Sequence, residues 1–376
     1  MIDENPFRYG IVVDDPYFIN REKELVEISL DLVSGNNLII TSPRRYGKTS
    51  LVIKVINQLE QKGYPVIYLD FFRIPDLKQF MDIYASQILK KQTGIKKSLG
   101  IFQKWIRGIR PAVSIDPSGS PAFTFTHDPL VPVYDSLTDI LNLPLKIDSD
   151  KRWIIVMDEF QDIEKLNGKE TEKWFRSVMQ FHARISYVFL GSKTHLIGQM
   201  FSQQDRAFYG FGKLMRIEKI PSVEMEKFIV SRMEQTGCRC DPSYATEMIS
   251  IADNIPYFVQ FLASETWNVS RDNDGIVDHA QIQRAIENIL NNQQDYFHQL
   301  IDPLSPYQKK ILKALSSDRT MIFSQDYMKK YDLRAVSSTQ RAIEKLLSAG
   351  IIEKDQETIA FSNPFFLRYL QQRVFT

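Results

Sequence analysis

The sequence predicts an α/β core, followed by a helical domain and a small terminal domain of three helices and a hairpin. Between residues 37 and 220, short apolar segments alternate with amphipathic helical segments. Apolar residues at successive positions are typical of strands buried on both faces of a parallel sheet. After Pro221 these segments stop and helical periodicity continues, and after Leu304 a two-strand signal follows three more helices. We therefore expect domains at residues 1–221, 222–302 and 303–376.

Composition narrows the class of protein. With 376 residues, of which 43% are hydrophobic and 25% charged, the chain can bury more than one core. Its net charge of +1 does not by itself indicate a nucleic-acid binder. No apolar run approaches the roughly 18 residues of a membrane span, and Met1–Asn5 does not resemble a signal peptide. We expect a cytoplasmic protein without membrane contact, with Cys238 and Cys240 as surface thiols.

The core elements follow one another as strand, helix, strand, which predicts a parallel sheet with helices on both faces. The predicted strands are Asn37–Thr41, Val66–Phe72, Trp153–Asp158, Tyr187–Gly191 and Leu214–Ile217. A helix from Thr49 to Gln61 connects the first two, and Gly63 follows its end. Alternating residues near 111–127, divided by a turn rich in Pro, Ser and Gly, predict a β-hairpin inserted into this core.

The second half of the chain predicts helices only, until the last strands. The expected helices are Val223–Gln235, Ser243–Ala252, Pro256–Val269, His279–Leu300, Tyr307–Leu315, Phe323–Tyr331 and Ser337–Ala349. Strands at Ile351–Lys354 and Thr358–Phe361 follow them. Three helices before a hairpin is the order of a winged helix, whose third helix reads DNA in the DNA-binding versions.

A phosphate-binding turn is predicted where the first strand meets the first long helix. Ser42–Thr49 fits the pattern Gly, four residues, Gly-Lys-Thr, except that Ser42 stands in place of the first glycine. Backbone N–H groups at a helix start face phosphates, so we expect ATP and Mg²⁺ here, with Lys48 on the β- and γ-phosphates and the Thr49 hydroxyl on the metal. A tight turn with an exposed lysine is the structural alternative. The expected nucleotide-binding residues of this segment are Pro43, Arg44, Arg45, Tyr46, Gly47, Lys48, Thr49 and Ser50.

Acidic and polar residues end two later strands of the core. Asp158 and Glu159 close one strand, and Ser192 follows another. The carboxyl ends of parallel strands border the crevice where nucleotides bind, so Asp158 is expected to hold Mg²⁺ and Glu159 to orient and polarise the attacking water. If the strand before Ser192 lies between the other two, Ser192 would sit near the γ-phosphate and position that water. Its alternative role is a helix N-cap.

Other charged residues leave their roles open. Arg206 and Lys213 are candidates for a cation that stabilises the transition state, and the sequence does not choose between them. Residues 83–115 contain no acidic side chain but several basic ones, which a solvated helix face or a phosphate-contacting patch would explain. Pro256 stands at a favoured first helical position.

These features together resemble the archaeal-type ATPases of the STAND branch of the AAA+ class. The resemblance rests on segments spread over nearly the whole chain: Asn5-Pro6-Phe7, Phe18–Leu25, Pro43–Thr49, Met157–Gln161, Leu190–Ser192, Asn254–Gln260 and Asn363–Leu370. It implies a P-loop ATPase domain, a helical lid and a winged helix that act as a nucleotide-driven switch. It also implies adenine contacts around Tyr17, Phe18 and Arg21, and a proline motif at the base of the lid that includes Pro256. The chain departs from the family at Ser42, and at Phe211, where many members carry an arginine after a Leu-Tyr-Gly-like stretch.

Three functions follow as hypotheses. The first is a slow Mg²⁺-dependent ATPase that acts as a switch in regulation or signalling, with a protein partner at the winged helix. The second is a DNA-binding regulator or mobile-element factor in which ATP tunes affinity, with Ser337, Ser338, Thr339, Gln340, Arg341 and Lys345 as plausible contacts. The third is a scaffold that holds nucleotide without turnover.

Overall fold

The computed structural model describes residues 4–91, 95–115, 121–272, 274–355 and 358–375. The chain forms two compact units. The first comprises residues up to Asn20, Pro43–Gly47 and the chain from Lys219 onwards, and the second comprises Arg21–Ser42 and Lys48–Glu218.

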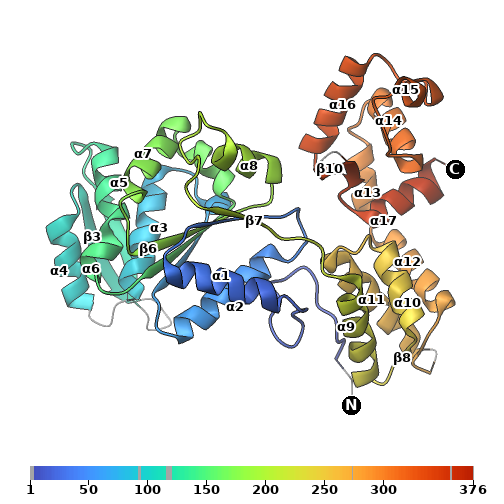
Figure 1. Ribbon diagram of the computed structural model, residues 1–376, viewed down its shortest axis with the longest axis horizontal. Helices are drawn as coiled ribbons and strands as arrows, with labels where there is room; N and C mark the ends of the chain where they lie inside the picture. The colour runs from blue at the N-terminus through green and yellow to red at the C-terminus, as the bar shows by residue number, and fades with distance from the viewer. Residues whose placement is uncertain (1–3, 92–94, 116–120, 273, 356–357, 376) are drawn as a thin grey trace. The chain divides into compact units, whose positions relative to one another are not determined.

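A parallel sheet forms the centre of the second unit (Figure 1). Its strands are β1 Leu38–Thr41, β2 Val66–Asp70, β5 Trp153–Asp158, β6 Ile185–Gly191 and β7 Lys213–Arg216, in the order β2-β5-β6-β1-β7. All four pairings are parallel, and every residue of β1, β5 and β6 is buried. The predicted parallel α/β core is therefore confirmed, and β6 lies between β1 and β5 as the expectation for Ser192 required.

Helices cover both faces of this sheet (Figure 1). On one face lie α1 Glu22–Ser34 and α2 Lys48–Gln61. On the other face, side chains of α3, α5, α7 and α8 belong to one hydrophobic cluster with Ile155, Met157 and Phe189 of the sheet. The bounds of the remaining elements are α3 Leu77–Lys90, α4 Ile95–Trp105, α5 Val133–Leu141, α6 Leu143–Ile147, α7 Lys169–Met179, α8 Thr194–Ser202, and the 3₁₀ segments Phe71–Arg73 and Phe160–Leu166.

The second predicted strand is shorter than expected. β2 ends at Asp70, whose carboxylate accepts the Phe72 N–H at 3.0 Å and caps the 3₁₀ turn Phe71–Arg73. Local capping by an aspartate therefore ends the strand, although Phe71 and Phe72 continue the apolar pattern.

The predicted hairpin is present between β2 and β5. Strands β3 Ile109–Ile115 and β4 Pro121–His127 pair antiparallel, and the connecting residues 116–120 lie outside the described residues. Two cations of the basic run nearby are paired with carboxylates: Lys91 with Glu60, and Arg107 with Asp139 at 2.9 Å. These pairs favour the solvated-surface interpretation of the run.

Helices of the predicted lid lie in the first unit. Their bounds are α9 Ser222–Gln235, α10 Pro242–Ile251, α11 Pro256–Arg271, α12 His279–Asn292 and α13 Gln294–Ile301, with short strands β8 Arg239–Cys240 and β9 Ile276–Val277. The single helix expected over 279–300 was wrong, because the helix breaks at Gln293. The break lets Phe297 contact the Phe366 and Tyr369 rings, with centroids 5.4 and 5.0 Å away.

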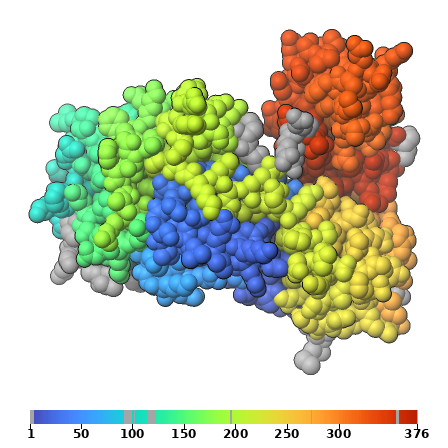
Figure 2. All heavy atoms as spheres, in the orientation of Figure 1, coloured from blue at the N-terminus to red at the C-terminus, as the bar shows by residue number. Residues whose placement is uncertain are grey.

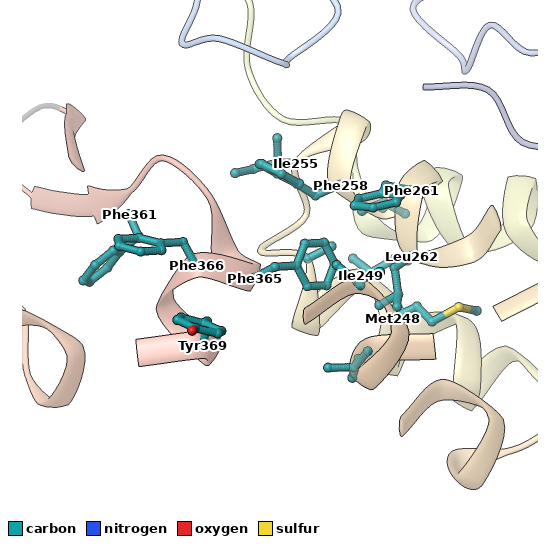
Figure 3. Close-up of a cluster of buried hydrophobic side chains, with 14 of the residues drawn as sticks. Met248, Ile249, Ile255, Phe258, Phe261, Leu262, Phe361, Phe365, Phe366 and Tyr369 are labelled. Carbon is teal, nitrogen blue, oxygen red and sulfur yellow. The ribbon is translucent and has the colours of Figure 1, made fainter. Parts of the chain in front are cut away.

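The winged helix follows in the predicted order. It consists of α14 Pro306–Ser317, α15 Gln325–Lys330, α16 Val336–Ser348, β10 Ile352–Asp355 and β11 Thr358–Phe361, followed by α17 Pro364–Tyr369 and a π-helical turn Leu370–Val374. Figure 2 shows the lid and the winged helix adjoining within the first unit. Phe365 joins them: its ring lies edge-on to Phe258 at 5.8 Å and to Phe261 at 5.7 Å (Figure 3).

Both cysteines are buried, so the expectation of surface thiols was wrong. Cys238 and Cys240 belong to the hydrophobic core of the first unit and form no disulfide. Burial raises the pKa of the Cys240 thiol to about 12. Separately, no helix among the described residues is long and apolar enough to cross a membrane.

Candidate functional site

The turn from β1 into α2 has the backbone that the phosphate-binding pattern predicts. Arg45 and Gly47 have positive φ angles of 72° and 85°, a conformation that glycine adopts without strain and other residues rarely adopt. Ser42 is buried and its φ is not positive. The position of the first glycine therefore does not need glycine in this chain, which accounts for the departure at Ser42.

Lys48 is the first residue of α2 and lies beside the acidic end of β5. Its side chain is buried, and Nζ is 3.9 Å from Asp158 Oδ1. The first turn of α2 carries no acidic residue that would compete with a bound anion for the positive helix end. The alternative of a tight turn with an exposed lysine is excluded.

Asp158 is fixed from two sides. Its Oδ1 accepts the Glu159 N–H at 2.8 Å, and its Oδ2 accepts the hydroxyl hydrogen of Tyr68 from the neighbouring strand β2. Burial, together with the charge of Asp158, raises the pKa of Tyr68, so this hydroxyl remains a donor. Burial also raises the pKa of Asp70, which pairs with Asp158 in the strand register. Tyr68 was not among the predicted site residues, because only the pairing of β2 with β5 brings it there.

Glu159 has a left-handed backbone conformation, with φ 49° and ψ 41°. Its side chain is held by hydrogen bonds that all go to one carboxylate oxygen. Oε2 accepts the Ser192 hydroxyl hydrogen at 2.9 Å, the Ser192 N–H at 3.4 Å, and an amide hydrogen from Gln161. Burial alone would raise the pKa of Glu159, but the Lys48 charge and these hydrogen bonds outweigh burial and lower it. The carboxylate is therefore ionised at neutral pH.

Ser192 acts on Glu159 and not as a helix cap. The N-cap of α8 is Lys193, and no side chain caps that helix, so the alternative role for Ser192 was wrong. The expected strand order places Ser192 beside the acidic pair, and its position near a γ-phosphate stays a prediction. Gln161 was part of the motif on which the family resemblance rests, but no role was predicted for it. Its position two residues after Glu159 was the available signal.

The turn residues Pro43–Gly47 belong to the first unit, and Arg45 contacts other residues of that unit. Its carbonyl accepts the Tyr257 N–H at 3.3 Å, and Nη1 donates to the Ser362 carbonyl at 2.9 Å. Its guanidinium lies 5.3 Å from the Tyr257 ring centroid and 4.8 Å from that of Phe258. Arg44 is exposed, and Tyr46 and Pro43 are buried. Pro256 is buried in the first turn of α11, as the helix-start signal predicted.

Both candidates for the cation that stabilises the transition state are paired with carboxylates within the second unit. Arg206 pairs with Glu164 at 2.7 Å and with Glu172 at 2.5 Å. Lys213 lies 2.8 Å from Glu27 and 2.7 Å from Asp31.

The predicted adenine-contacting residues are placed as follows. Arg21 is buried and donates to Glu24 at 2.9 Å and to the Glu218 carbonyl at 2.8 Å. Phe18 is half-buried, and so is Tyr17, whose ring lies near the Arg8 and Arg232 guanidiniums. A separate cavity of about 240 Å³ in the first unit is lined by Ser250, Ile251, Asp253, Arg319, Phe361, Pro364, Leu367, Arg368 and Gln371, and contains none of the predicted site residues.

Solved structures of low sequence identity share this fold. The Walker-type ATPase PABY2304 of Pyrococcus abyssi superposes with a TM-score of 0.64 at 15% identity, over 95% of this chain and 97% of that one. The ORC2 protein of Aeropyrum pernix, in ADPNP–ADP complexes, gives 0.55 at 14% identity over 97% of both chains. The ORC1 protein of the same organism, in complex with DNA, gives 0.52 at 14% identity over 98% and 97%. No curated protein matches the chain.

Two family models match. Residues 295–372 match a probable winged helix domain. Residues 18–227, more than half of the chain, match an ATPase domain found predominantly in Archaea, and they contain Lys48, Asp158, Glu159 and Ser192. The chain therefore belongs to this family of archaeal-type ATPases and carries a C-terminal winged helix.

Proposed function

We propose that this chain binds ATP with Mg²⁺, hydrolyses it slowly, and acts as a nucleotide-driven switch. The observation that carries the proposal is the cluster at the carboxyl edge of the sheet: Lys48 faces Asp158, and Ser192 binds Glu159. A buried lysine at a helix start next to two carboxylates suits the phosphates and metal of a nucleotide. The ADPNP–ADP complexes of the structurally similar ORC2 protein support nucleotide binding.

Lys48 would bind the β- and γ-phosphates, with the backbone of the turn and Ser50 around them. The adenine contacts at Phe18 and Arg21, and the part of Pro256 in nucleotide binding, remain predictions.

The residues present fit Mg²⁺. Among the described residues, no group of three or more His, Cys, Asp or Glu side chains could form an all-protein metal site. Mg²⁺ in nucleotide sites needs only one or two protein oxygens, because phosphates and water complete its shell. Thr49 and Asp158 would supply them, and the metal would neutralise charge on the phosphates.

Glu159 is suited to activate the attacking water. Its carboxylate is ionised, and Ser192 on the adjacent strand holds it. We expect slow turnover because the two candidate cations for the transition state, Arg206 and Lys213, are both paired with carboxylates. A free cation at the transition state contributes about 10³–10⁵-fold in related enzymes.

Arg45 supports the switch. It lies three residues before Lys48, and its side chain contacts the Tyr257 and Phe258 rings of the lid and the Ser362 carbonyl after β11. Each such contact is worth about 0.5–1 kcal/mol. Together they match the 1–3 kcal/mol that couples two sites in typical allosteric proteins. A change of the turn on nucleotide exchange would thus alter how the winged helix is held.

Nucleotide content and turnover of Glu159→Gln test the ATPase. Glu159→Gln should retain bound ATP and lose about 10²–10⁴-fold in turnover, because the amide cannot accept the proton from water. Glu170→Gln, an exposed glutamate on α7, is the matched control and should behave as wild type. Equal turnover in Glu159→Gln and wild type would overturn the assignment of the base, and a wild type without turnover would leave the scaffold function.

Hydrogen exchange tests the switch. The Phe365 N–H is bonded to Asn363 Oδ1 at 2.9 Å, beside the Ser362 carbonyl that Arg45 binds. Exchange around residues 362–366 should differ between ADP and a non-hydrolysable ATP analogue in wild type and in Arg239→Ala, which removes an exposed arginine on β8. In Arg45→Ala the difference should vanish. A difference that persists unchanged in Arg45→Ala would contradict the coupling.

DNA binding is a second candidate function, favoured by one surface. On α16, Gln340, Arg341 and Lys345 are exposed, and the structurally similar ORC1 protein was solved with DNA. Thr339, proposed above as a contact, is buried and bonded to the Tyr307 hydroxyl at 2.7 Å, so that contact was wrong. If contacts with DNA phosphates drive binding, the affinity for duplex DNA should fall steeply between low and moderate salt. An affinity that does not change with salt would favour a protein partner at the winged helix instead. The STAND assignment and a cytoplasmic location remain predictions.

A further inference from the structure

The two oxygens of the Glu159 carboxylate are not equivalent. Oε2 accepts all three hydrogen bonds, from the Ser192 hydroxyl, the Ser192 N–H and the Gln161 amide. No hydrogen bond to Oε1 is present among the described residues. Since one carboxylate oxygen accepts about two hydrogen bonds, Oε2 is saturated and Oε1 has the remaining capacity to accept a proton.

Gln161 is held for this contact. Its side chain is buried, and a Cβ on Gly191 would lie 2.6 Å from Gln161 Oε1. The same Cβ would lie 2.1 Å from Ile197 Cγ1, so glycine at the end of β6 leaves room for both Ile197 and the amide. The amide cannot be reversed, because its oxygen would then face a carboxylate that only accepts. The Oε1 atom of Gln161 is buried without a hydrogen bond, which destabilises this arrangement. The hydrogen bond from the Gln161 amide to Glu159 offsets that cost.

The backbone conformation of Glu159 explains why its side chain must be held by other groups. Glu159 has left-handed φ and ψ, a conformation that costs a non-glycine residue on the order of 1–3 kcal/mol and persists only where its surroundings fix it. Gln161 and Ser192 lie on two different segments and both hydrogen-bond to the Glu159 side chain, which holds the residue in this conformation.

We propose that Gln161 is a positioning residue for ATP hydrolysis, which fixes Glu159 Oε2 and leaves Oε1 to take the proton of the attacking water. The inference rests on the proposed ATPase function. In the step, the water oxygen bonds to the γ-phosphorus while its proton passes to Oε1. The bond from that phosphorus to the bridging oxygen breaks, and its electron pair stays on the departing ADP.

Gln161→Met tests this role, since it keeps the length of the side chain and removes the amide. We expect kcat to fall about 10–100-fold while the KM for ATP stays within about twofold, because a misplaced base affects chemistry and not binding. Gln161→Asn, too short to reach Oε2, should show the same loss. Gln199→Met, an exposed glutamine on α8, is the control. Thermal unfolding of each variant confirms its folded state.

A double-mutant cycle separates positioning from a structural effect. In the Glu159→Gln background, residual turnover measured by single-turnover release of radiolabelled phosphate should change less than about twofold on adding Gln161→Met. Equal losses in both backgrounds, or a kcat in Gln161→Met and Gln161→Asn within twofold of wild type, would overturn the positioning role alone. A wild type without turnover would instead overturn the ATPase function, and this inference with it.

Discussion

Ser192 on the loop after β6 donates its hydroxyl hydrogen to Glu159 at the end of β5, with 2.9 Å between the two oxygens. The two residues are 33 positions apart in the chain, and the pairing of β5 with β6 brings them together. Under the proposed function, a polar residue that holds the acidic group would also respond to a γ-phosphate, and this hydrogen bond would link the proposed base to the state of the nucleotide.

Lys48→Ala should weaken ATP binding about 100-fold or more. Hydrogen bonds to charged groups are worth about 1.5–3 kcal/mol each, and the substitution removes the buried cation that faces Asp158. The fold should persist, because alanine is the best helix former. Titration with a fluorescent ATP analogue, alongside circular dichroism, measures both. Lys62→Ala, exposed just beyond the same helix, is the control, and undiminished affinity in Lys48→Ala would contradict the site.

Phe365→Ala should destabilise the first unit by about 3–5 kcal/mol, because its fully buried ring packs between the lid and the winged helix. Urea unfolding followed by intrinsic fluorescence would show a lower midpoint. Phe323→Ala removes a ring that is 39% exposed and should cost less than about 1 kcal/mol. Similar shifts for the two variants would argue against a packed interface.

Both thiols should be unreactive in the folded protein at neutral pH. Cys238 and Cys240 are buried, and burial raises the pKa of Cys240 to about 12, so almost no thiolate is present. A chromogenic disulfide reagent should titrate two thiols only after unfolding. Rapid reaction of either thiol in the native protein would contradict their placement.

His182 should make stability depend on pH below neutrality. Its ring is buried, hydrogen-bonded to Tyr187 at 2.6 Å, and burial lowers its pKa to about 4. The unfolded state takes up a proton near pH 6.5 and the folded state only near pH 4, so stability is full above 6.5 and falls as the pH drops between these values. The loss attributable to this histidine is about 3 kcal/mol.

His182→Gln provides the check on this effect. The variant should be less stable than wild type at pH 7, because hydrogen bonds are lost, but its stability should fall less between pH 6.5 and 4.5. Parallel pH curves for the two proteins, from urea unfolding, would show that another group is responsible.

The sequence by itself determined the features whose signals are local. The strand–turn–helix around Lys48, the acidic pair at the end of β5 and the order of the winged helix could be predicted, because strand burial, helix starts and turn residues act over a few neighbouring positions. The helix break at Gln293 is also local but was not predicted, since a break of one residue hardly disturbs the apolar pattern.

Only the tertiary structure decided which side chains meet. The hydrogen bonds of Ser192 and Tyr68 to the acidic pair, the engagement of Arg206 by Glu164 and Glu172, the contact of Arg45 with Ser362 and the burial of the cysteines depend on strand order and on packing between distant segments. These hydrogen bonds and ion pairs join residues from 33 to 317 positions apart, and no local pattern encodes them, because their energy exists only once the core has brought those segments together. Lys48 and Ser192 were visible in the sequence, whereas the hydrogen bonds that hold Glu159 in place were not.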